Sequence, residues 1–457
     1  MIKPFSENNN LGALRALMSK HLFSDEVKNE MDRFLSQTII GLGQGGGRIA
    51  SELARLGFPT FLINSSKSDM EEFKNLIPAE RRLLTRSKKY AELEGTDKNA
   101  QLGYEIAVEN KEIYKKVAMD NAVRNAEFVW VCVSLGGGTG NGALKVALTY
   151  LSAVRQEKIL PTGKIPLGVI CSLPSKDEKG SSFRKNALAG INLLKKFQDE
   201  NKIGSVLVID NEKMKNYYEE DPLRTYGGRI IDAKSYSNMV VASTIAEISS
   251  IPLLEGRVVL DKTELLSTLS TPGWLSVSKY EVEQNDNINS VIKRLFSENE
   301  VLANYKTESA ISGAVAVLYP VTKNMDPKIA DDVYAYASNL LDTQVNLSVS
   351  INSKIQKLTL YGLAVYLSPS LRIKELYEEL KEWEEIEKSQ RELKKATLME
   401  LNEFDDFFQL RNETPSRTTV NLDDLDVSFG ENASDSIPAE PSGRTTIRPV
   451  DLDDIDF

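Results

Sequence analysis

Two glycine-rich segments, each directly after an apolar run, have the residue types and spacing best suited to chemistry. The more specific one is residues 136–142, Gly-Gly-Gly-Thr-Gly-Asn-Gly, which follows the apolar run 131–134 and precedes a helical pattern. Glycine lets successive backbone N–H groups converge on an anion, and a helix that begins there favours negative charge. No Gly-Lys-Ser/Thr of a P-loop occurs here. We therefore expect backbone amides and helix ends to hold a di- or triphosphate.

The first glycine-rich segment, residues 41–47, is the less specific of the two. Gly41, Gly43 and Gly46 satisfy the G-x-G-x-x-G pattern, so a dinucleotide-binding fold must be considered. Such a fold places Asp or Glu at the end of its second strand, where the carboxylate binds the ribose hydroxyls. Here that strand ends in Asn64-Ser65-Ser66. This counts against an NAD(P)-binding oxidoreductase, which stays as the less favoured alternative.

Asp261 and Glu264 form the other candidate chemical group. They are three residues apart, so at the start of a helix they share one face. Carboxylates can orient and activate a water molecule for attack on a γ-phosphate. The same Asp-x-x-Glu spacing is also a frequent helix N-cap. The residues alone leave both interpretations open.

These segments need a scaffold, and the apolar pattern predicts a parallel sheet of Rossmann-like type. Continuous apolar runs alternate with helical patterns up to about residue 210, as expected for strands that are covered on both faces. The predicted strands are residues 38–41, 58–63, 128–133, 167–172 and 206–209. A helix over 235–248 follows, and then strands at 309–318, 345–351 and 357–367 indicate a smaller α+β domain. A helix over 371–401, about 45 Å long, comes next.

Composition excludes several classes of protein. The 457 residues predict about two to four domains. One histidine and two cysteines exclude multi-histidine metal sites and a disulfide framework. The net charge of −10 argues against direct nucleic-acid binding through a basic face. No apolar run reaches the ~18 residues of a membrane-spanning helix, and the N-terminus lacks an apolar signal core. We expect a cytoplasmic protein without membrane insertion.

The acidity is concentrated at the C-terminus. Residues 412–457 hold 11 acids and 3 bases, which leaves 55 acids and 53 bases in the other 411 residues. This segment is also rich in Ser, Thr, Pro and Asn, so we expect it to be disordered. A near-repeat, Leu-Asp-Asp-Leu-Asp at 422–426 and Leu-Asp-Asp-Ile-Asp at 452–456, indicates either a docking motif used twice or a solubilising tail.

The glycine-rich segment 136–142 resembles the signature of the tubulin/FtsZ superfamily, with Asn141 where the family usually has Ser or Thr. The resemblance covers about residues 37–400 and is strongest to the TubZ group of plasmid- and phage-encoded bacterial tubulins. Five further segments carry it: Ile39-Gly41-Leu42-Gly43 with Gly45-Gly46; Asn99 with Gln101 and Gly103; Val208-Ile209-Asp210-Asn211; Tyr236-Ser237-Asn238; and Thr271-Pro272-Gly273 with Leu275-Ser276.

This resemblance implies a site for GTP or GDP with Mg²⁺, whose metal ligands the sequence does not identify. The first loop (Gly43, Gln44, Gly45, Gly46), the second (Gly136, Gly137, Gly138, Thr139, Gly140, Asn141, Gly142), and Asn64, Ser65, Gly95, Lys98 and Asn99 would surround the phosphates and the metal. Asn211 and Asn238 would read the guanine edge, because an amide both donates and accepts. Tyr236 is a candidate to stack on the base.

The resemblance also implies a function and a domain order. Asp261 and Glu264 would reach the nucleotide of a neighbouring subunit, so that GTP hydrolysis would require head-to-tail filaments. The implied role is plasmid or phage DNA segregation through a DNA-binding adaptor on the tail; the alternative is an FtsZ-like division or phage-positioning filament. The expected parts are an N-terminal helical extension (1–36), a GTP-binding domain (37–232), a central helix and catalytic loop (233–264), an α+β activation domain (265–368), a long C-terminal helix (369–408) and an acidic tail (409–457).

Overall fold

A computed structural model describes residues 34–90, 92–220, 222, 228, 230–253, 256–258, 260–297, 303–321, 327–352 and 355–408. The acidic tail and nearly all of the N-terminal extension lie outside these residues. Among the described residues, those up to Glu384 belong to one compact unit and residues 385–408 to a second. None of the described helices is both long enough and apolar enough to cross a bilayer.

One sheet of eleven strands forms the centre of the first unit, in the order β3-β2-β1-β4-β5-β6-β8-β11-β9-β10-β7. From β3 to β8 every neighbouring pair is parallel, whereas β11 is antiparallel to both β8 and β9. The strands are β1 Gln37–Leu42, β2 Thr60–Asn64, β3 Arg82–Leu84, β4 Phe128–Ser134, β5 Leu167–Leu173, β6 Ser205–Asp210, β7 Gly256–Val258, β8 Gly273–Glu281, β9 Ala310–Pro320, β10 Val345–Asn352 and β11 Thr359–Tyr366.

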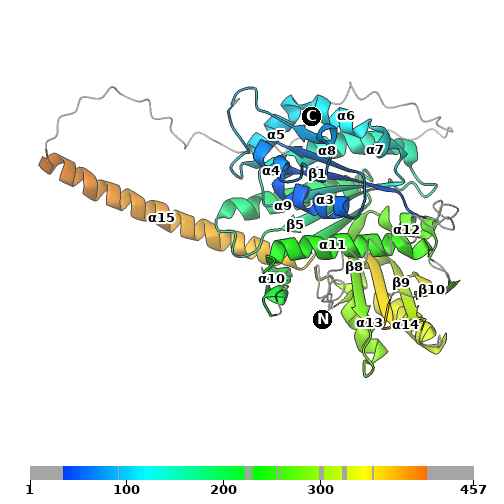
Figure 1. Ribbon diagram of the computed structural model, residues 1–457. Coiled ribbons are helices and arrows are strands. Elements are labelled where there is room, and N and C mark those ends of the chain that lie inside the picture. The colour runs from blue at the N-terminus through cyan, green and yellow to red at the C-terminus, as the bar shows by residue number, and fades with distance from the viewer. Residues whose placement is uncertain are drawn as a thin grey trace, which may run out of the picture. The chain divides into compact units, whose positions relative to one another are not determined.

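Helices cover both faces of this sheet and so explain the continuous apolar strands (Figure 1). On β1, Ile39 packs into one buried cluster and its neighbour Ile40 into the other. One face is covered by α5 Ala100–Glu109, α6 Lys111–Ala118, α7 Asn121–Asn125, α8 Thr139–Arg155, α9 Ser181–Asp199, α13 Ile288–Phe296 and α14 Pro327–Leu341. The other is covered by α3 Gly43–Arg55, α10 Asn211–Glu220, α11 Ala233–Ser250 and α12 Lys262–Leu269.

The strands expected for the smaller α+β domain are present as β9, β10 and β11, and they continue the main sheet. β6 pairs in parallel with β8, with Val206 opposite Trp274, which joins the two groups of strands. The sequence pattern did not predict β8, because Lys279 and two serines interrupt its apolar residues, although both faces of this strand are buried. The buried carboxylate of Glu247 on α11 lies 3.3 Å from the Lys279 ammonium, so the strand can bury this charge.

The long C-terminal helix, α15, runs from Arg372 to Phe408, so it is 37 residues and about 55 Å long. Its beginning is held in the first unit by Leu376, whose side chain is fully buried. Tyr377, Ile386 and Leu393 on the same helix are exposed.

Candidate functional site

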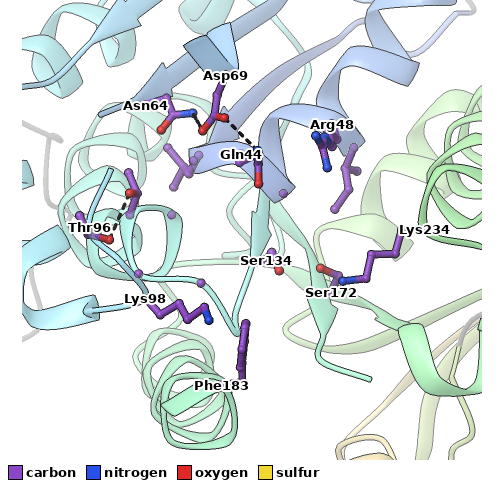
Figure 2. Close-up of a pocket in the computed structure, with 18 of the residues that line it drawn as sticks. Gln44, Arg48, Asn64, Asp69, Thr96, Lys98, Ser134, Ser172, Phe183 and Lys234 are labelled. Atoms are coloured by element: carbon purple, nitrogen blue, oxygen red, sulfur yellow. Dashed lines mark hydrogen bonds between the residues drawn. The ribbon is translucent and has the colours of Figure 1, made fainter. Parts of the chain in front are cut away.

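A cavity of about 380 Å³ lies where β1 and β4 end and α3 and α8 begin. In the sheet order, connections from β1 and β4 leave in opposite directions at this point, which is where open parallel sheets bind ligands. Its volume falls within the range of small-molecule sites. The fold therefore brings both glycine-rich segments to one cavity (Figure 2).

The two glycine segments pack backbone against backbone, and this contact requires glycine. Gly43 has φ +65°, and a Cβ there would lie 2.7 Å from the amide nitrogen of Gly140. A Cβ on Gly140 would lie 2.5 Å from the carbonyl oxygen of Leu42. Gly46 fits against β4 in the same way, since its Cβ would be 2.1 Å from the Cys132 carbonyl oxygen.

Helices α3 and α8 both begin at the cavity without a side-chain cap. Their N-cap residues are Leu42 and Gly138, neither of which makes a side-chain hydrogen bond to the first turn. The first amide groups of a helix have no partner within the helix, and the helix dipole adds positive potential there. Two such ends at one cavity make an anion site.

Hydroxyl and carboxylate oxygens lie beside these helix ends. The Thr139 hydroxyl is 3.0 Å from that of Ser65 and 3.3 Å from that of Thr96. The Asp69 carboxylate accepts hydrogen bonds from Gln44 Nε2 at 2.8 Å and Asn64 Nδ2 at 3.1 Å (Figure 2). In the described part of the chain, no group of three or more His, Cys, Asp or Glu could hold a metal ion. A Mg²⁺ ion here would depend on phosphate oxygens and water for most of its ligands.

Lys98 supplies a cation from the loop before α5. Its φ of +65° is unusual for a residue with a side chain, and its ammonium lies 4.8 Å from the centre of the Phe183 ring. Asn186 Nδ2, from the same helix as Phe183, donates to the carbonyl oxygens of Lys98 at 2.8 Å and Gly136 at 3.2 Å. Helix α9 therefore fixes this loop and the second glycine segment together.

Asn211 and Asn238 line the cavity from α10 and α11. Asn211 begins α10, and the preceding carboxylate of Asp210 accepts from the amides of Glu212 at 3.1 Å and Lys213 at 3.2 Å. Burial raises the pKa of Asp210, while the hydrogen bond from Lys213 and the Arg372 charge act in the opposite direction. On the same side, Lys234 lies 3.1 Å from Glu178.

The structure brings many of the predicted binding residues to the cavity and places others behind its wall. The lining includes Gly43, Gln44, Gly45, Asn64, Lys98, Gly137, Gly138, Thr139, Gly140, Asn211 and Asn238. Outside the lining are Gly46, Ser65, Gly95, Asn99, Gly136, Asn141, Gly142 and Tyr236.

Several of the residues outside the lining have a different structural task. Asn99 caps α5 by accepting from the Leu102 amide at 3.0 Å, and Asn141 Nδ2 donates to the Asn186 carbonyl at 2.7 Å. Tyr236 packs on Tyr218 with ring centres 4.5 Å apart. Base stacking by Tyr236 therefore gains no support from this geometry.

Sequence reasoning missed part of the lining: Leu42, Arg48, Ile49, Asp69, Thr96, Asp97, Ser134, Ser172, Glu178, Phe183 and Lys234. Ser134 and Thr96 could have been found, because they are next to segments that were singled out. Phe183 and Lys234 lie at the starts of α9 and α11, and no local pattern marks them; only the fold brings them to the cavity.

Asp261 and Glu264 lie apart from the cavity lining and form a capping box at the start of α12. Asp261 Oδ1 accepts from the Glu264 amide at 2.7 Å, and Glu264 Oε2 accepts from the Asp261 amide at 3.2 Å. Lys234 and Asn238 line the cavity from the beginning of α11, whose 18 residues span about 27 Å. Asp261 and Glu264 come after its other end, where Figure 1 shows α12. The capping interpretation is observed, and the hydrolytic role stays a prediction.

Comparison with known proteins gives likenesses to one family, to curated proteins and to solved structures. Residues 36–219 match the Tubulin/FtsZ family, GTPase domain. The Tubulin-like protein TubZ of Bacillus cereus is 26% identical over 277 residues, 57% of this chain and only 58% of TubZ. The Tubulin-like protein CetZ of Pyrococcus horikoshii is 27% identical over 286 residues, 62% of this chain and 72% of CetZ. A GTPγS-form protofilament of TubZ from Bacillus thuringiensis serovar israelensis has the same fold, with a TM-score of 0.63 and 21% identity over 80% of this chain and 99% of that one.

Proposed function

We propose that this chain, whose residues 36–219 match the Tubulin/FtsZ family, is a GTPase that polymerises head to tail. The observation that carries the proposal is the pair of uncapped helix starts, α3 and α8, at one glycine-lined cavity. They suit the phosphates of a nucleotide. At the other side of the cavity, Asn211 and Asn238 suit the donor and acceptor groups of guanine.

The charges that line the cavity support a nucleotide bound with Mg²⁺. Arg48, Lys98 and Lys234 are offset by three carboxylates, those of Asp69, Asp97 and Glu178. A triphosphate therefore depends on backbone amides and on a divalent cation for most of its neutralisation. Thr139 and Asp69 offer the hard oxygen ligands that Mg²⁺ prefers, and the ion, when bound, would neutralise charge that develops on the phosphates.

Hydrolysis would use a second copy of the chain. Asp261 and Glu264 follow the far end of α11, while the cavity lies at its beginning. In a head-to-tail stack, the α12 end of one copy faces the cavity of the next, and such contacts build open filaments. The two carboxylates would then orient the attacking water at the γ-phosphate.

The test measures GTP turnover per molecule as the protein concentration rises. A site shared between copies requires turnover per molecule to rise steeply at the concentration where filaments sediment. Turnover that stays flat across that range would contradict the proposal. Nucleotide extracted from the purified protein decides between this proposal and an oxidoreductase, since it would be guanine in one case and nicotinamide in the other.

The cellular role we propose is DNA segregation in the cytoplasm, by a filament that holds an adaptor protein through the acidic tail. The TubZ likenesses support it, and one of the similar structures is that of a type III plasmid segregation TubZ. The alternative is a division or phage-positioning filament; a Cell division protein FtsZ of Haloferax mediterranei is also similar, at 24% identity. A pull-down with the full chain and with residues 1–411 tests the role: deletion must remove the adaptor and leave filaments intact.

A further inference from the structure

Three buried charged side chains connect the beginning of α15 to the walls of the cavity. The side chains of Arg372 and Arg184 are each 1% exposed, and that of Glu379 is 11% exposed. Glu379 bridges the two arginines: Oε2 accepts from Arg184 Nε at 3.0 Å, and Oε1 accepts from Arg372 Nη1. Buried charges are retained only where each one is paired. The first two turns of α15 are therefore fixed by ion pairs as well as by apolar packing.

Arg372 extends this network to β6, where α10 begins. Its Nε lies 3.6 Å from Asp210 Oδ1, and its Nη2 donates to the Pro174 carbonyl at 3.2 Å. The same Asp210 oxygen accepts from the amides of Glu212 and Lys213 and so fixes the first turn of α10. Asn211, which lies in that turn, lines the cavity. Of the two cations whose charges lower the pKa of Asp210, the loss of Arg372 would leave Lys213 alone against the burial of this carboxylate.

Arg184 connects Glu379 to the loop between β5 and α9. Its Nη2 donates to the Ser175 carbonyl at 3.1 Å, and its Nη1 donates to the Glu178 carbonyl. Glu178 lines the cavity and pairs with Lys234 at the start of α11. The segments that carry the lining residues Asn211 and Glu178 are thus both connected to Glu379 on α15.

We propose that Arg372 is a positioning residue for nucleotide recognition: it pairs with the Asp210 carboxylate, which accepts from the first amides of α10 and so holds Asn211 at the cavity. The inference rests on the proposed function, because it assigns Asn211 to the 2-amino group at the guanine edge. Arg372, the first residue of the C-terminal helix, does not line the cavity, and it strengthens the preference for guanine through Asn211.

The test compares the binding of GDP with that of inosine diphosphate, which lacks the 2-amino group of guanine. Arg372→Met should bind GDP about tenfold more weakly and inosine diphosphate only slightly more weakly than the wild type does. Lys374→Met is the matched control, since Lys374 is on the same helix with its side chain 85% exposed, and it should bind both nucleotides normally. Thermal melting of each variant establishes that it is folded.

The double variant Arg372→Met/Asp210→Asn distinguishes two roles of Arg372: the positioning of Asn211 through Asp210 and the anchoring of α15 through Glu379. Asn keeps an oxygen that caps α10 and removes the unpaired buried charge, so the double variant should fold and recover GDP binding to within about threefold of wild type. Wild-type GDP binding by Arg372→Met, an equal loss for both nucleotides, or a double variant that is unfolded or as weak as Arg372→Met would each overturn the inference. A wild-type chain that binds neither nucleotide would instead overturn the proposed function on which the inference rests.

Discussion

The two ends of α11 differ in what surrounds them: a formed cavity lies at the beginning, and two candidate acids outside that cavity follow the other end. At its beginning, Lys234 and Asn238 line a formed cavity. Other residues of the lining come from β1, β4, α9 and α10. Beyond its other end, Asp261 and Glu264 bond to each other's backbone amides, away from that cavity. One copy of the chain thus forms the cavity by itself, whereas its two candidate hydrolytic acids come after the far end of the 18-residue α11. If this difference is functional, damage at one end must leave the task of the other end intact.

The largest effect is expected at the α12 end. Asp261→Asn should lower GTP turnover at least about 100-fold, because the amide cannot act as a carboxylate toward water. Asn caps a helix as well as Asp does, so the free energy of unfolding should change by less than ~0.5 kcal/mol. Steady-state phosphate release and urea unfolding measure the two quantities.

The matched control for that variant is Asp120→Asn, the same change at the N-cap of α7. It should leave turnover unchanged. Normal turnover in Asp261→Asn would mean that Asp261 is a cap and nothing more, and the comparison between the two ends would lose its functional meaning.

A smaller effect is expected at the cavity end. Gly43→Ala places a Cβ 2.7 Å from the Gly140 amide nitrogen at a φ of +65°, so the two glycine segments must separate. We expect GDP affinity to fall on the order of 30-fold. Gly47→Ala is the control from the same segment, since its Cβ would have no neighbour closer than 3.8 Å. Titration with a fluorescent GDP analogue measures both, and equal affinities would contradict the close packing of the two segments.

The smallest effect on binding and turnover is expected from the contacts that hold α11 between its two ends, which act on stability instead. Burial raises the pKa of Glu247 to about 7, against the lowering effects of the Lys279 ammonium and the Tyr361 hydroxyl; Glu281 raises it further. The folded chain keeps this proton up to about pH 7, and the unfolded chain loses it near the ordinary value of 4.5. The contribution of Glu247 to stability therefore falls as pH rises between these values, by at most ~1.4 kcal/mol per pH unit.

Glu247→Gln should remove this dependence, and urea unfolding at pH 5, 6 and 7 measures it. Glu281→Gln is the control, because Glu281 also lies near Lys279, at 3.7 Å, but has a side chain that is 48% exposed. It should keep most of the wild-type slope, because burial, the largest cause of the raised pKa of Glu247, is unchanged. Parallel profiles for wild type and Glu247→Gln would show that the buried carboxylate does not titrate in this range.

Sequence reasoning was most successful where local physics decides the structure. The apolar strands and the two glycine segments follow from burial on both faces and from backbone approach, and both segments lie at the cavity. It failed where distant partners decide. The buried Lys279 of β8 has its partner, Glu247, on α11, and Phe183 and Lys234 reach the cavity from the starts of separate helices. The Asp261–Glu264 spacing was read as either cap or catalyst, and a single chain displays only the cap.

The most direct test of a site shared between copies mixes two inactive variants. Asp261→Asn keeps the cavity and lacks the acid, whereas Gly43→Ala keeps the acid and has a damaged cavity. In a head-to-tail contact, the cavity of the first meets Asp261 of the second and forms one intact site. We predict that each variant alone hydrolyses GTP poorly and that the mixture regains a substantial fraction of wild-type turnover. A mixture as inactive as its two components, with both variants folded, would contradict the account.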